Sequence, residues 1–566
     1  MTKRWTYAPE GSPEAIAALT EELGASYSAL ARVLVQRGMS SLEQIKAWIP
    51  GTPLSAVDPL RMADMPQAAQ RLAQAREQGE RVMLFGDYDV DGTTAVSVGK
   101  LALERGGWTI LTYIPDRYKE GYGLSEAGIS HAVASDVRVL VALDCGIKSV
   151  DLIASAQARG IDVIVADHHT PGPQLPPALA VLDPKRSDCS FPHKELSGCG
   201  VGYMLWRAAY QAVGLDPNAL HDLLDLVAVS IGADMVPLVG LNRAMVREGL
   251  AAINSQPRAS LAALLGNRPA GHITLQDVVF AIGPKINAAG RMRHGHLAVD
   301  LLTQLQPVLL EQLSQDIESH NVERRSTEQG VSLAAQAQAA LLTHRTGLVL
   351  TGEGWHKGVL GIVAQRTVEA FYKPTVVLTL HEGLYSGSAR SVPGLDLYDC
   401  LDASSEHLIQ FGGHRAAAGM TLKPEQLEAF VEAFDQAVDE RWPLEARQPR
   451  QLVDSRARID ELHAPLANLL ERLEPFGMEN EAPIWGLEEV ELTQVRTMSE
   501  GKHLRALARD PHTGTTLPVI GFGWGHMEIT GPVHLAVVLE WNIFRGNKEL
   551  QARILDLQIC TPHGKE

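Results

Sequence analysis

Short apolar runs alternate with longer amphipathic stretches from residue 81 to residue 166. The apolar runs have the length of strands, and they lie at 81–85, 108–114, 137–143 and 161–166. Helices are expected between them, at 93–103 and 149–159, with Ser125 capping a further helix. Strands separated by helices of this length predict a parallel sheet built from βαβ units, so this region is expected to be α/β.

The pattern of residues after this α/β region predicts other kinds of element. Residues 304–345 carry charges at helical spacing and contain no proline after Pro307, which predicts one long helix or two in series. A helix at 462–473 is followed by five strand-like runs, at 487–496, 503–508, 516–521, 533–541 and 550–557. Five short strands indicate a small barrel, for which an OB-fold is the commonest candidate.

We therefore expect five segments. They are an N-terminal helical segment (1–50), a first α/β domain (51–303), a connecting helix (304–345), a smaller αβ domain (346–442) and a C-terminal barrel (451–562).

Composition narrows the class of protein. The chain has 566 residues, 45% of them apolar, and a net charge of −17, which argues against a protein that coats nucleic acid through bulk positive charge. Neither a signal peptide nor a membrane span is visible in the sequence. The five cysteines are scattered without CxxC spacing, so they are expected to be free thiols in a reducing cytoplasm.

Acidic residues gather just after the predicted strands. Asp87, Asp89 and Asp91 follow the first strand, Asp144 follows the third, and Asp167-His168-His169 follows the fourth; Asp234 ends the apolar helix at 223–231. Because ligands of open parallel sheets bind at the carboxyl ends of the strands, these groups should converge on one crevice.

Other interpretations of the first cluster fit less well. An EF-hand calcium loop that opened at Asp87 would need a glutamate at its twelfth position, where Val98 stands, and a helix rather than a strand before it. A P-loop would need GxxxxGK[ST], which is absent. A solvated acidic turn is possible, but three aspartates directly after a buried strand repel one another and favour a bound cation.

The other two clusters have structural alternatives as well. Asp144 could be a helix cap, and His168 and His169 could be a structural pair, although Asp167 beside them favours a ligand role. Carboxylates and imidazoles without a thiolate suit Mn²⁺ or Mg²⁺ better than zinc. The surplus of acids suggests two ions, about 3.5–4 Å apart, which is an arrangement for phosphoester hydrolysis.

Read together, these four motifs resemble the DHH phosphoesterase superfamily. The second αβ unit resembles the associated DHHA1 domain through Gly412-Gly413-His414, 416–419, 356–359 and 361–364. Further motifs resemble the RecJ exonuclease family, namely Gly-Pro-Lys-Ile-Asn-Ala-Ala-Gly-Arg at 283–291, 387–391 and 474–477.

The resemblance implies a role for each acid and imidazole. Asp89, Asp91, Asp144, His168 and Asp234 would bind the metals, with Asp144 bridging them. His169 would contact the scissile phosphate, so His169, Asp91 and Asp144 form the expected catalytic set. Asp87 and Asp167 would orient ligands, and whether Asp87 also binds metal directly stays open.

The resemblance also implies a substrate. It predicts an exonuclease that removes mononucleotides from the 5′ end of single-stranded DNA with Mn²⁺ or Mg²⁺, in recombination and repair. It is expected to act as a cytoplasmic monomer, with a single-strand DNA-binding protein and a helicase as partners. The alternatives are a hydrolase of short oligonucleotides, cyclic dinucleotides or pyrophosphate, a non-catalytic replication scaffold, and a tRNA-editing domain.

Six residues are candidates for binding this substrate. Ser388 and Arg390, in a predicted glycine-flanked turn, would grip the terminal phosphate, with Arg117 as a second candidate for that pocket. Gly413 and His414 could hold the nucleotide, and Arg291 could pair with a backbone phosphate. In the barrel, Trp541, Phe544 and Arg545 either stack bases or belong to the core.

Overall fold

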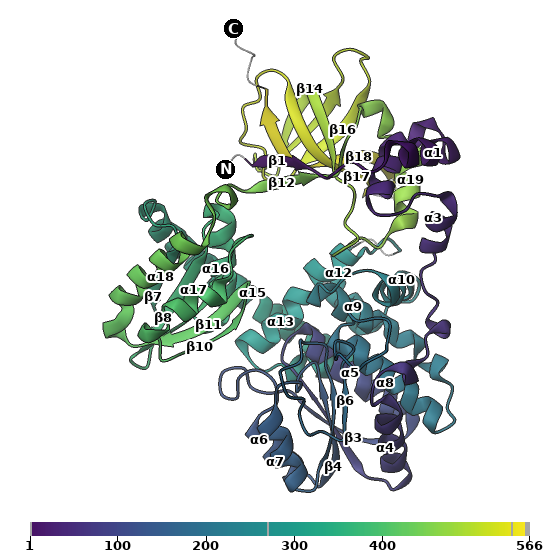
Figure 1. Ribbon diagram of the computed structural model, residues 1–566, viewed down its shortest axis with the longest axis vertical. Helices are drawn as coiled ribbons and strands as arrows, with labels where there is room; N and C mark the ends of the chain where they lie inside the picture. The colour runs from purple at the N-terminus through teal and green to yellow at the C-terminus, as the bar shows by residue number, and fades with distance from the viewer. Residues whose placement is uncertain (1–2, 269–270, 545–546, 561–566) are drawn as a thin grey trace. The chain divides into compact units, whose positions relative to one another are not determined.

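The computed structural model describes residues 3–268, 271–544 and 547–560 (Figure 1). Arg545 lies outside these ranges. The chain divides into two compact units. We call residues 52–443 with 477–480 the larger unit, and residues 1–51, 444–476 and 481–566 the barrel unit.

The larger unit begins with a five-stranded parallel sheet in the order β3-β2-β4-β5-β6. Its strands are β2 (Arg81–Gly86), β3 (Thr109–Tyr113), β4 (Val137–Leu143), β5 (Asp162–Ala166) and β6 (Ala180–Leu182). The parallel sheet predicted from the apolar runs is confirmed. The carboxyl ends of β2, β4 and β5 are adjacent in this order, which brings the three acidic clusters to one edge.

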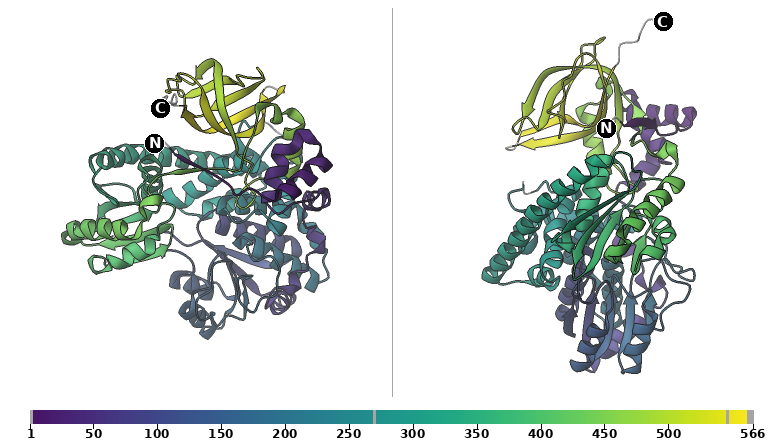
Figure 2. Two further views of the ribbon diagram at one scale, coloured as in Figure 1. Left: turned by 45° about the horizontal axis from the view of Figure 1, so that its top comes forward. Right: turned by 90° about the vertical axis from the view of Figure 1, so that its left-hand side faces the viewer.

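Helices cover both faces of this sheet (Figures 1 and 2). One face packs against α4 (Met65–Glu77), α5 (Val90–Gly106) and α8 (Gly198–Ala212), and the other against α6 (Glu126–Ala134) and α7 (Val150–Ala158). Each face of the sheet has its own hydrophobic core, and the β2 side chains alternate between them. Val82 and Leu84 pack in the core with α4, α5 and α8, and Met83 and Phe85 pack in the core with α6 and α7. A strand buried on both faces is apolar throughout, as the sequence of β2 is.

A helical layer continues the first core. Its helices are α9 (Leu224–Asp234), α10 (Gly240–Ser255), α11 (Ala259–Leu265), α12 (Leu275–Ala281), α13 (Gly283–Met292) and α14 (His296–Thr303). The connecting segment forms a single helix, α15 (Pro307–Leu341), which decides between the two predicted arrangements.

The second sheet of the larger unit is mixed, in the order β10-β11-β9-β8-β7. Its strands are β7 (Leu348–Glu353), β8 (Thr375–His381), β9 (Leu384–Arg390), β10 (Gln410–His414) and β11 (Ala417–Leu422). Its helices are α16 (Lys357–Phe371), α17 (Leu397–Ala403) and α18 (Leu427–Arg441). Only β7 and β8 are parallel, as expected for a pair joined through a helix.

The barrel unit contains five strands that close on themselves through the pairing of β14 with β17. They are β14 (Trp485–Met498), β15 (His503–Arg509), β16 (Thr516–Gly521), β17 (Val533–Phe544) and β18 (Asn547–Ile559), and they confirm the OB-fold. Helix α19 (Ala464–Leu473) belongs to the same core. Trp541 is half-buried on β17, with Lys548 Nζ 4.7 Å from its ring centre.

The N-terminal segment is not helical throughout. Residues Arg4–Tyr7 form β1, which pairs in parallel with β12 (Arg450–Val453). Three helices follow, α1 (Pro13–Leu23), α2 (Ser28–Gln36) and α3 (Leu42–Trp48). The helical prediction is therefore wrong for the first residues, because pairing with a strand distant in the sequence decides their conformation.

No described helix combines the length and the apolar character needed to cross a membrane. All five cysteines are free, and four of them are buried.

Candidate metal centre

The first acidic cluster occupies the tight connection from β2 to α5. Asp89 caps the helix by accepting a hydrogen bond from the Gly92 amide at 3.0 Å, and Asp91 stands in the first turn. Gly92 permits this turn, since a Cβ there would lie 2.4 Å from the backbone nitrogen of Asp87. The three carboxylates are thereby held at the carboxyl end of β2.

Asp91 is fixed in orientation by three donors from other elements. The amides of Gly198 and Cys199, at the start of α8, donate to its two oxygens at 2.6 and 2.8 Å. Ser230 Oγ, on α9, donates at 2.6 Å. Because three donors fix this carboxylate, its orientation toward a bound cation would be set by the surrounding protein.

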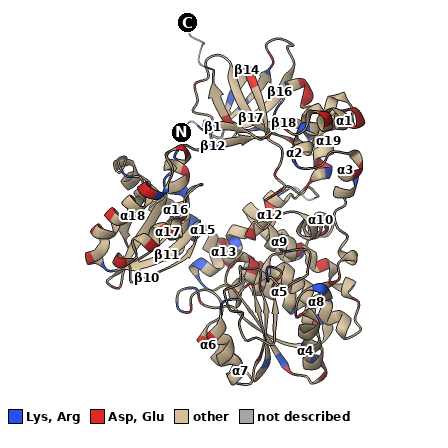
Figure 3. Ribbon diagram, in the orientation of Figure 1, with Lys and Arg blue, Asp and Glu red and all other residues tan. Residues whose placement is uncertain are grey.

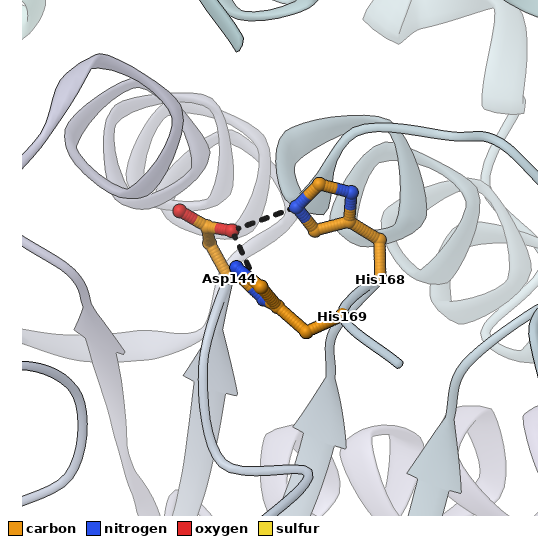
Figure 4. Close-up of side chains that lie close together, drawn as sticks. All are labelled: Asp144, His168 and His169. Atoms are coloured by element: carbon orange, nitrogen blue, oxygen red, sulfur yellow. Dashed lines mark ion pairs between the residues drawn. The ribbon is translucent and has the colours of Figure 1, made fainter. Parts of the chain in front are cut away.

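His168 lies among three carboxylates. Its Nε2 is 3.2 Å from Asp144 Oδ1, 3.6 Å from Asp234 Oδ2 and 3.8 Å from Asp91 Oδ2. Figure 4 shows the His168 and His169 rings directed at Asp144 from the end of the neighbouring strand. Asp144 has a φ of 59°, a left-handed conformation that is uncommon outside glycine and that is typical of functional positions.

His169 is held from both sides of its ring. Its Nδ1 lies 2.7 Å from Asp167 Oδ1, and its Nε2 lies 3.1 Å from the Tyr122 hydroxyl. Burial works to lower the pKa of His169, but the hydrogen bond and the charge of Asp167 outweigh it, so the pKa is raised. Asp167 also accepts from the amides of Ile147, His168 and His169, which makes it a positioning residue.

The carboxylates raise one another's pKa. Burial, reinforced by neighbouring aspartates, raises the pKa of Asp87 and that of Asp234 to about 8. The same causes raise the pKa of Asp144 well above its ordinary value. Burial lowers the pKa of His168, which favours the neutral imidazole that a metal requires. A divalent cation would relieve this accumulation of negative charge.

The residues present fit divalent metal ions. At this site, four buried atoms have no hydrogen-bond partner among the described residues: Asp87 Oδ2, Asp144 Oδ1 and both ring nitrogens of His168. Buried polar atoms without partners are costly unless a ligand satisfies them. Two groups bring ligand atoms within 4.8 Å of one another, Asp144-His168-His169 and Asp91-His168-Asp234. Asp87 and Asp89 belong to neither group.

Comparisons with known proteins agree with this geometry. Three family models match successive parts of the chain: the DHH family N-terminal domain over residues 81–231, the DHHA1 domain over 344–440 and the RecJ OB domain over 453–556. The single-stranded-DNA-specific exonuclease RecJ of Dickeya dadantii is 34% identical over 555 residues, which cover 93% of this chain and 95% of that protein.

The chain belongs to the RecJ family.

Other RecJ proteins support this assignment. RecJ of Bacillus subtilis is 33% identical, over 95% of this chain and 69% of that protein. The crystal structure of RecJ in complex with Mn²⁺ from Thermus thermophilus is similar with a TM-score of 0.83 and 26% identity, over all of this chain and 80% of that one. A structure of the same protein with Mg²⁺ has a TM-score of 0.77.

The predicted phosphate-binding pair of this RecJ chain lies on a strand. Ser388 and Arg390 are part of β9, and Arg390 Nη1 lies 3.2 Å from Ser388 Oγ. The predicted glycine-flanked turn is therefore wrong. Gly387 lies within β9, where a Cβ would be 2.1 Å from the Val377 oxygen on β8. Glycine is therefore required at this position by the close packing of the two strands.

Gly413 and His414 lie on β10 of the same sheet. His414 pairs with Ala417, and Ala417 pairs with Arg390, so His414 and Arg390 share one row across the sheet. One strand separates them, which places their backbones about 10 Å apart. The structure thus brings the candidates of this domain to one end of its sheet.

Arg117 and Arg291 approach from the first domain. The Arg117 guanidinium lies 4.5 Å from the ring centre of Tyr88, and Arg291 Nη1 donates to the Gly358 oxygen, at the start of α16, at 3.2 Å. Burial, followed by the charges of Arg117, Arg324 and Arg390, lowers the pKa of Arg291 to about 10. Four arginines therefore influence one another here, in a chain whose net charge is strongly negative.

Sequence reasoning missed three members of this site, which are Ser230, Tyr122 and Arg324. Ser230 lies four residues before Asp234 on one helix, so both fall on the same helical face, and this spacing was a usable signal. Tyr122 and Arg324 carry no such signal, because the fold alone brings them close to His169 and Arg291.

Proposed function

We propose that this chain removes 5′-mononucleotides from the 5′ end of single-stranded DNA by hydrolysis at a centre for two Mn²⁺ or Mg²⁺ ions. The observation that carries the proposal is the buried His168 Nε2, which lacks a hydrogen-bond partner and lies within 3.8 Å of three carboxylates. The RecJ relatives, named single-stranded-DNA-specific exonucleases, support the choice of substrate.

The metal ligands come from four segments of the larger unit. Asp89 and Asp91 from the β2–α5 connection, Asp144 from β4, His168 from β5 and Asp234 from α9 would hold the ions, with Asp144 shared between them. Asp87, whose buried Oδ2 has no hydrogen-bond partner among the described residues, would either orient this set or bind an ion directly. When bound, the ions supply the positive charge that activates water and stabilises the leaving oxygen.

His169 would contact the scissile phosphate. Asp167 holds its Nδ1, and its Nε2, which contacts the Tyr122 hydroxyl at 3.1 Å, would exchange that partner for a phosphate oxygen of the substrate. Because Asp167 raises the pKa of His169, the imidazolium persists to higher pH and offsets the charge that develops in the transition state.

The arginines would hold the end of the strand. Arg390 and Ser388 bind the 5′-phosphate with Arg117, and Arg291 pairs with a backbone phosphate. Gly413 and His414 support the terminal nucleotide. The three domains would then have separate tasks. The first domain (51–303) hydrolyses the phosphodiester bond, the second (346–442) holds the 5′ end, and the barrel (451–562) binds the rest of the strand.

The family resemblance further suggests a cytoplasmic monomer that works in recombination and repair with a single-strand DNA-binding protein and a helicase.

The test uses a 5′-phosphorylated single strand of about 40 nucleotides, beyond the roughly 4–16 that one OB-fold engages. The strand is labelled at its 3′ end and incubated with Mn²⁺ beside the same sequence as a blunt duplex. We expect shortening of the single strand from its 5′ end, sparing of the duplex, and no activity in EDTA.

Matched variants separate the metal site from general damage. Asp91→Ala should be inactive, whereas Asp216→Ala, at an exposed aspartate that accepts from the Asn218 amide, should retain activity. An intact long strand together with cleaved dinucleotides would move the chain to the branch of small-substrate hydrolases. Turnover of neither substrate would favour a non-catalytic scaffold.

A further inference from the structure

Five helices of the larger unit enclose a pocket beside the metal centre. Its volume is about 290 Å³, and its lining includes Ala233, Val279, Phe280, Asn287, Arg291 and Arg324. Ala233 directly precedes the candidate ligand Asp234, so the pocket lies next to this part of the candidate metal centre. Its volume is close to the lower end of the roughly 300–1,000 Å³ of small-molecule sites, which suits part of a nucleotide.

One side of the pocket presents an aromatic ring. Phe280, on α12, is 67% exposed, although its neighbours Val278 and Ala281 are buried. Val279 and Ile362 continue this apolar wall. An exposed phenylalanine beside a catalytic centre offers a flat face on which a nucleic acid base can stack.

The other side presents positive charge. The Arg324 side chain is only 12% exposed; its two terminal nitrogens donate to Asn321 and Glu328, and its Nε has no partner in the described part of the chain. Arg291 lies on α13, whose lysine and arginine positions are blue in Figure 3. A guanidinium in the wall of the pocket supplies positive charge beside which a phosphate can bind.

Several residues of the sequence motif at 283–291 line this pocket. Gly283, Pro284, Asn287 and Arg291 all line it, whereas the proposed function uses only Arg291. Three further residues of the motif therefore converge on a site to which no role has been given.

We propose that this pocket is a nucleotide subsite for single-stranded DNA, in which a base stacks on Phe280 and a backbone phosphate binds beside Arg324. The inference rests on the proposed function and adds a contact beyond the 5′-phosphate. Charge complementarity selects this occupant: Arg291 and Arg324 both line the pocket, so a chain of net charge −17 presents local positive charge to a polyanion there.

The test scans a missing base along the strand. Single-stranded DNA carrying a labelled 5′-phosphate and one abasic nucleotide at successive positions is incubated with Mn²⁺, and release of the first labelled nucleotide gives KM and kcat. For the wild type we expect one abasic position to raise KM about tenfold, a factor that corresponds to about 1.4 kcal/mol and lies within the range of one base–aromatic stack.

Variants of Phe280 decide the assignment. Phe280→Ala should raise KM about tenfold on intact DNA and abolish the sensitivity at that position, and Phe280→Trp should restore both. Val133→Ala, at a residue that is 44% exposed on α6, is the matched control and should behave as the wild type. An unchanged abasic profile in Phe280→Ala, or an equal loss at every position, would overturn the subsite.

Arg324 is tested separately, because it also contacts the buried Glu328. Arg324→Lys keeps the charge and should retain most affinity, whereas Arg324→Gln should raise KM and weaken its dependence on salt. An unchanged KM in Arg324→Gln, with thermal unfolding as in the wild type, would remove the phosphate contact from the proposal. If the wild-type protein released no nucleotide from any single-stranded DNA, the proposed exonuclease function itself would be refuted.

Discussion

The two sheets of the larger unit place their candidate site residues differently. In the parallel sheet these residues follow the strands, as Asp87 follows β2, Asp144 follows β4 and Asp167 follows β5. In the mixed sheet they lie within the strands, as Ser388 and Arg390 do on β9. The first arrangement lets three separate loops meet at one point, and the second holds a few side chains in a fixed row.

The two groups also differ in charge. The ends of the parallel strands and of α9 bring together carboxylates, and burial together with their mutual repulsion raises the pKa of Asp87 and Asp234. The mixed sheet instead contributes Arg390 to a cluster of arginines. Acids gathered in this way need a cation, and the arginines need an anion. The comparison therefore predicts that damage to the first group abolishes chemistry, while damage to the second changes which strand ends are accepted.

The largest effect is expected for His168. His168→Ala removes the imidazole that lies among three carboxylates, so metal binding and turnover should fall by more than about 100-fold, since loss of a supporting residue alone costs about 10–100-fold. Single-turnover nuclease assays and Mn²⁺ titration would measure both. His221→Ala, at an exposed histidine that pairs with Glu248, is the matched control. Full activity in His168→Ala would refute its role as a ligand.

A smaller loss is expected when the support of His169 is weakened. Asp167→Asn keeps the size of the side chain but removes the charge that raises the pKa of His169. The value of kcat should fall about 10–100-fold, with less change in KM. The alkaline limb of the pH profile of kcat, where the His169 imidazolium loses its proton, should also move to lower pH. A profile that falls in height without moving would indicate a structural role alone.

The pKa values of the acids predict how metal binding depends on pH. Without metal, Asp234 has a pKa of about 8, so it is protonated below that pH and must release a proton when a cation binds. Each acid that releases a proton on binding should add up to about tenfold per pH unit to the rise in apparent Mn²⁺ affinity, and the part that comes from Asp234 should level off above about pH 8. Calorimetric titrations at about pH 6 to 9 would measure this slope. Asp234→Asn should flatten it, and an unchanged slope would exclude Asp234 as the source of the proton.

The contrast between the two sheets explains why the sequence predicted the site residues of the first sheet better than those of the second. In the parallel sheet, apolar runs predict the strands, and the topology alone brings Asp91, Asp144 and His168 together because all follow strand ends. In the mixed sheet, glycines near Arg390 indicated a turn. Gly387 instead permits close packing of neighbouring strands, which is a tertiary contact that local sequence does not reveal.

Other features were equally inaccessible to local patterns. Residues Arg4–Tyr7 form a strand because they pair with β12, more than 440 positions away in the chain. Arg324 belongs to the arginine cluster only because α15 packs against α13. A periodic pattern predicts the helix itself but not which of its residues faces a site.

The smallest effect is expected at the mixed sheet, where Arg390→Ala should leave the metal centre intact. It removes a partly buried guanidinium that we assign to the 5′-phosphate, and a hydrogen bond to a charged group contributes about 1.5–3 kcal/mol. We expect the preference for phosphorylated over hydroxyl 5′ ends to fall by about tenfold, the lower end of that range, while kcat on hydroxyl ends is unchanged. Competition between the two kinds of strand in one reaction measures this ratio directly.

Arg441→Ala, on α18 of the same domain, is the matched control and should leave the ratio as it is in the wild type. If Arg390→Ala slowed both ends equally, the mixed sheet would support the chemistry and not select the strand end.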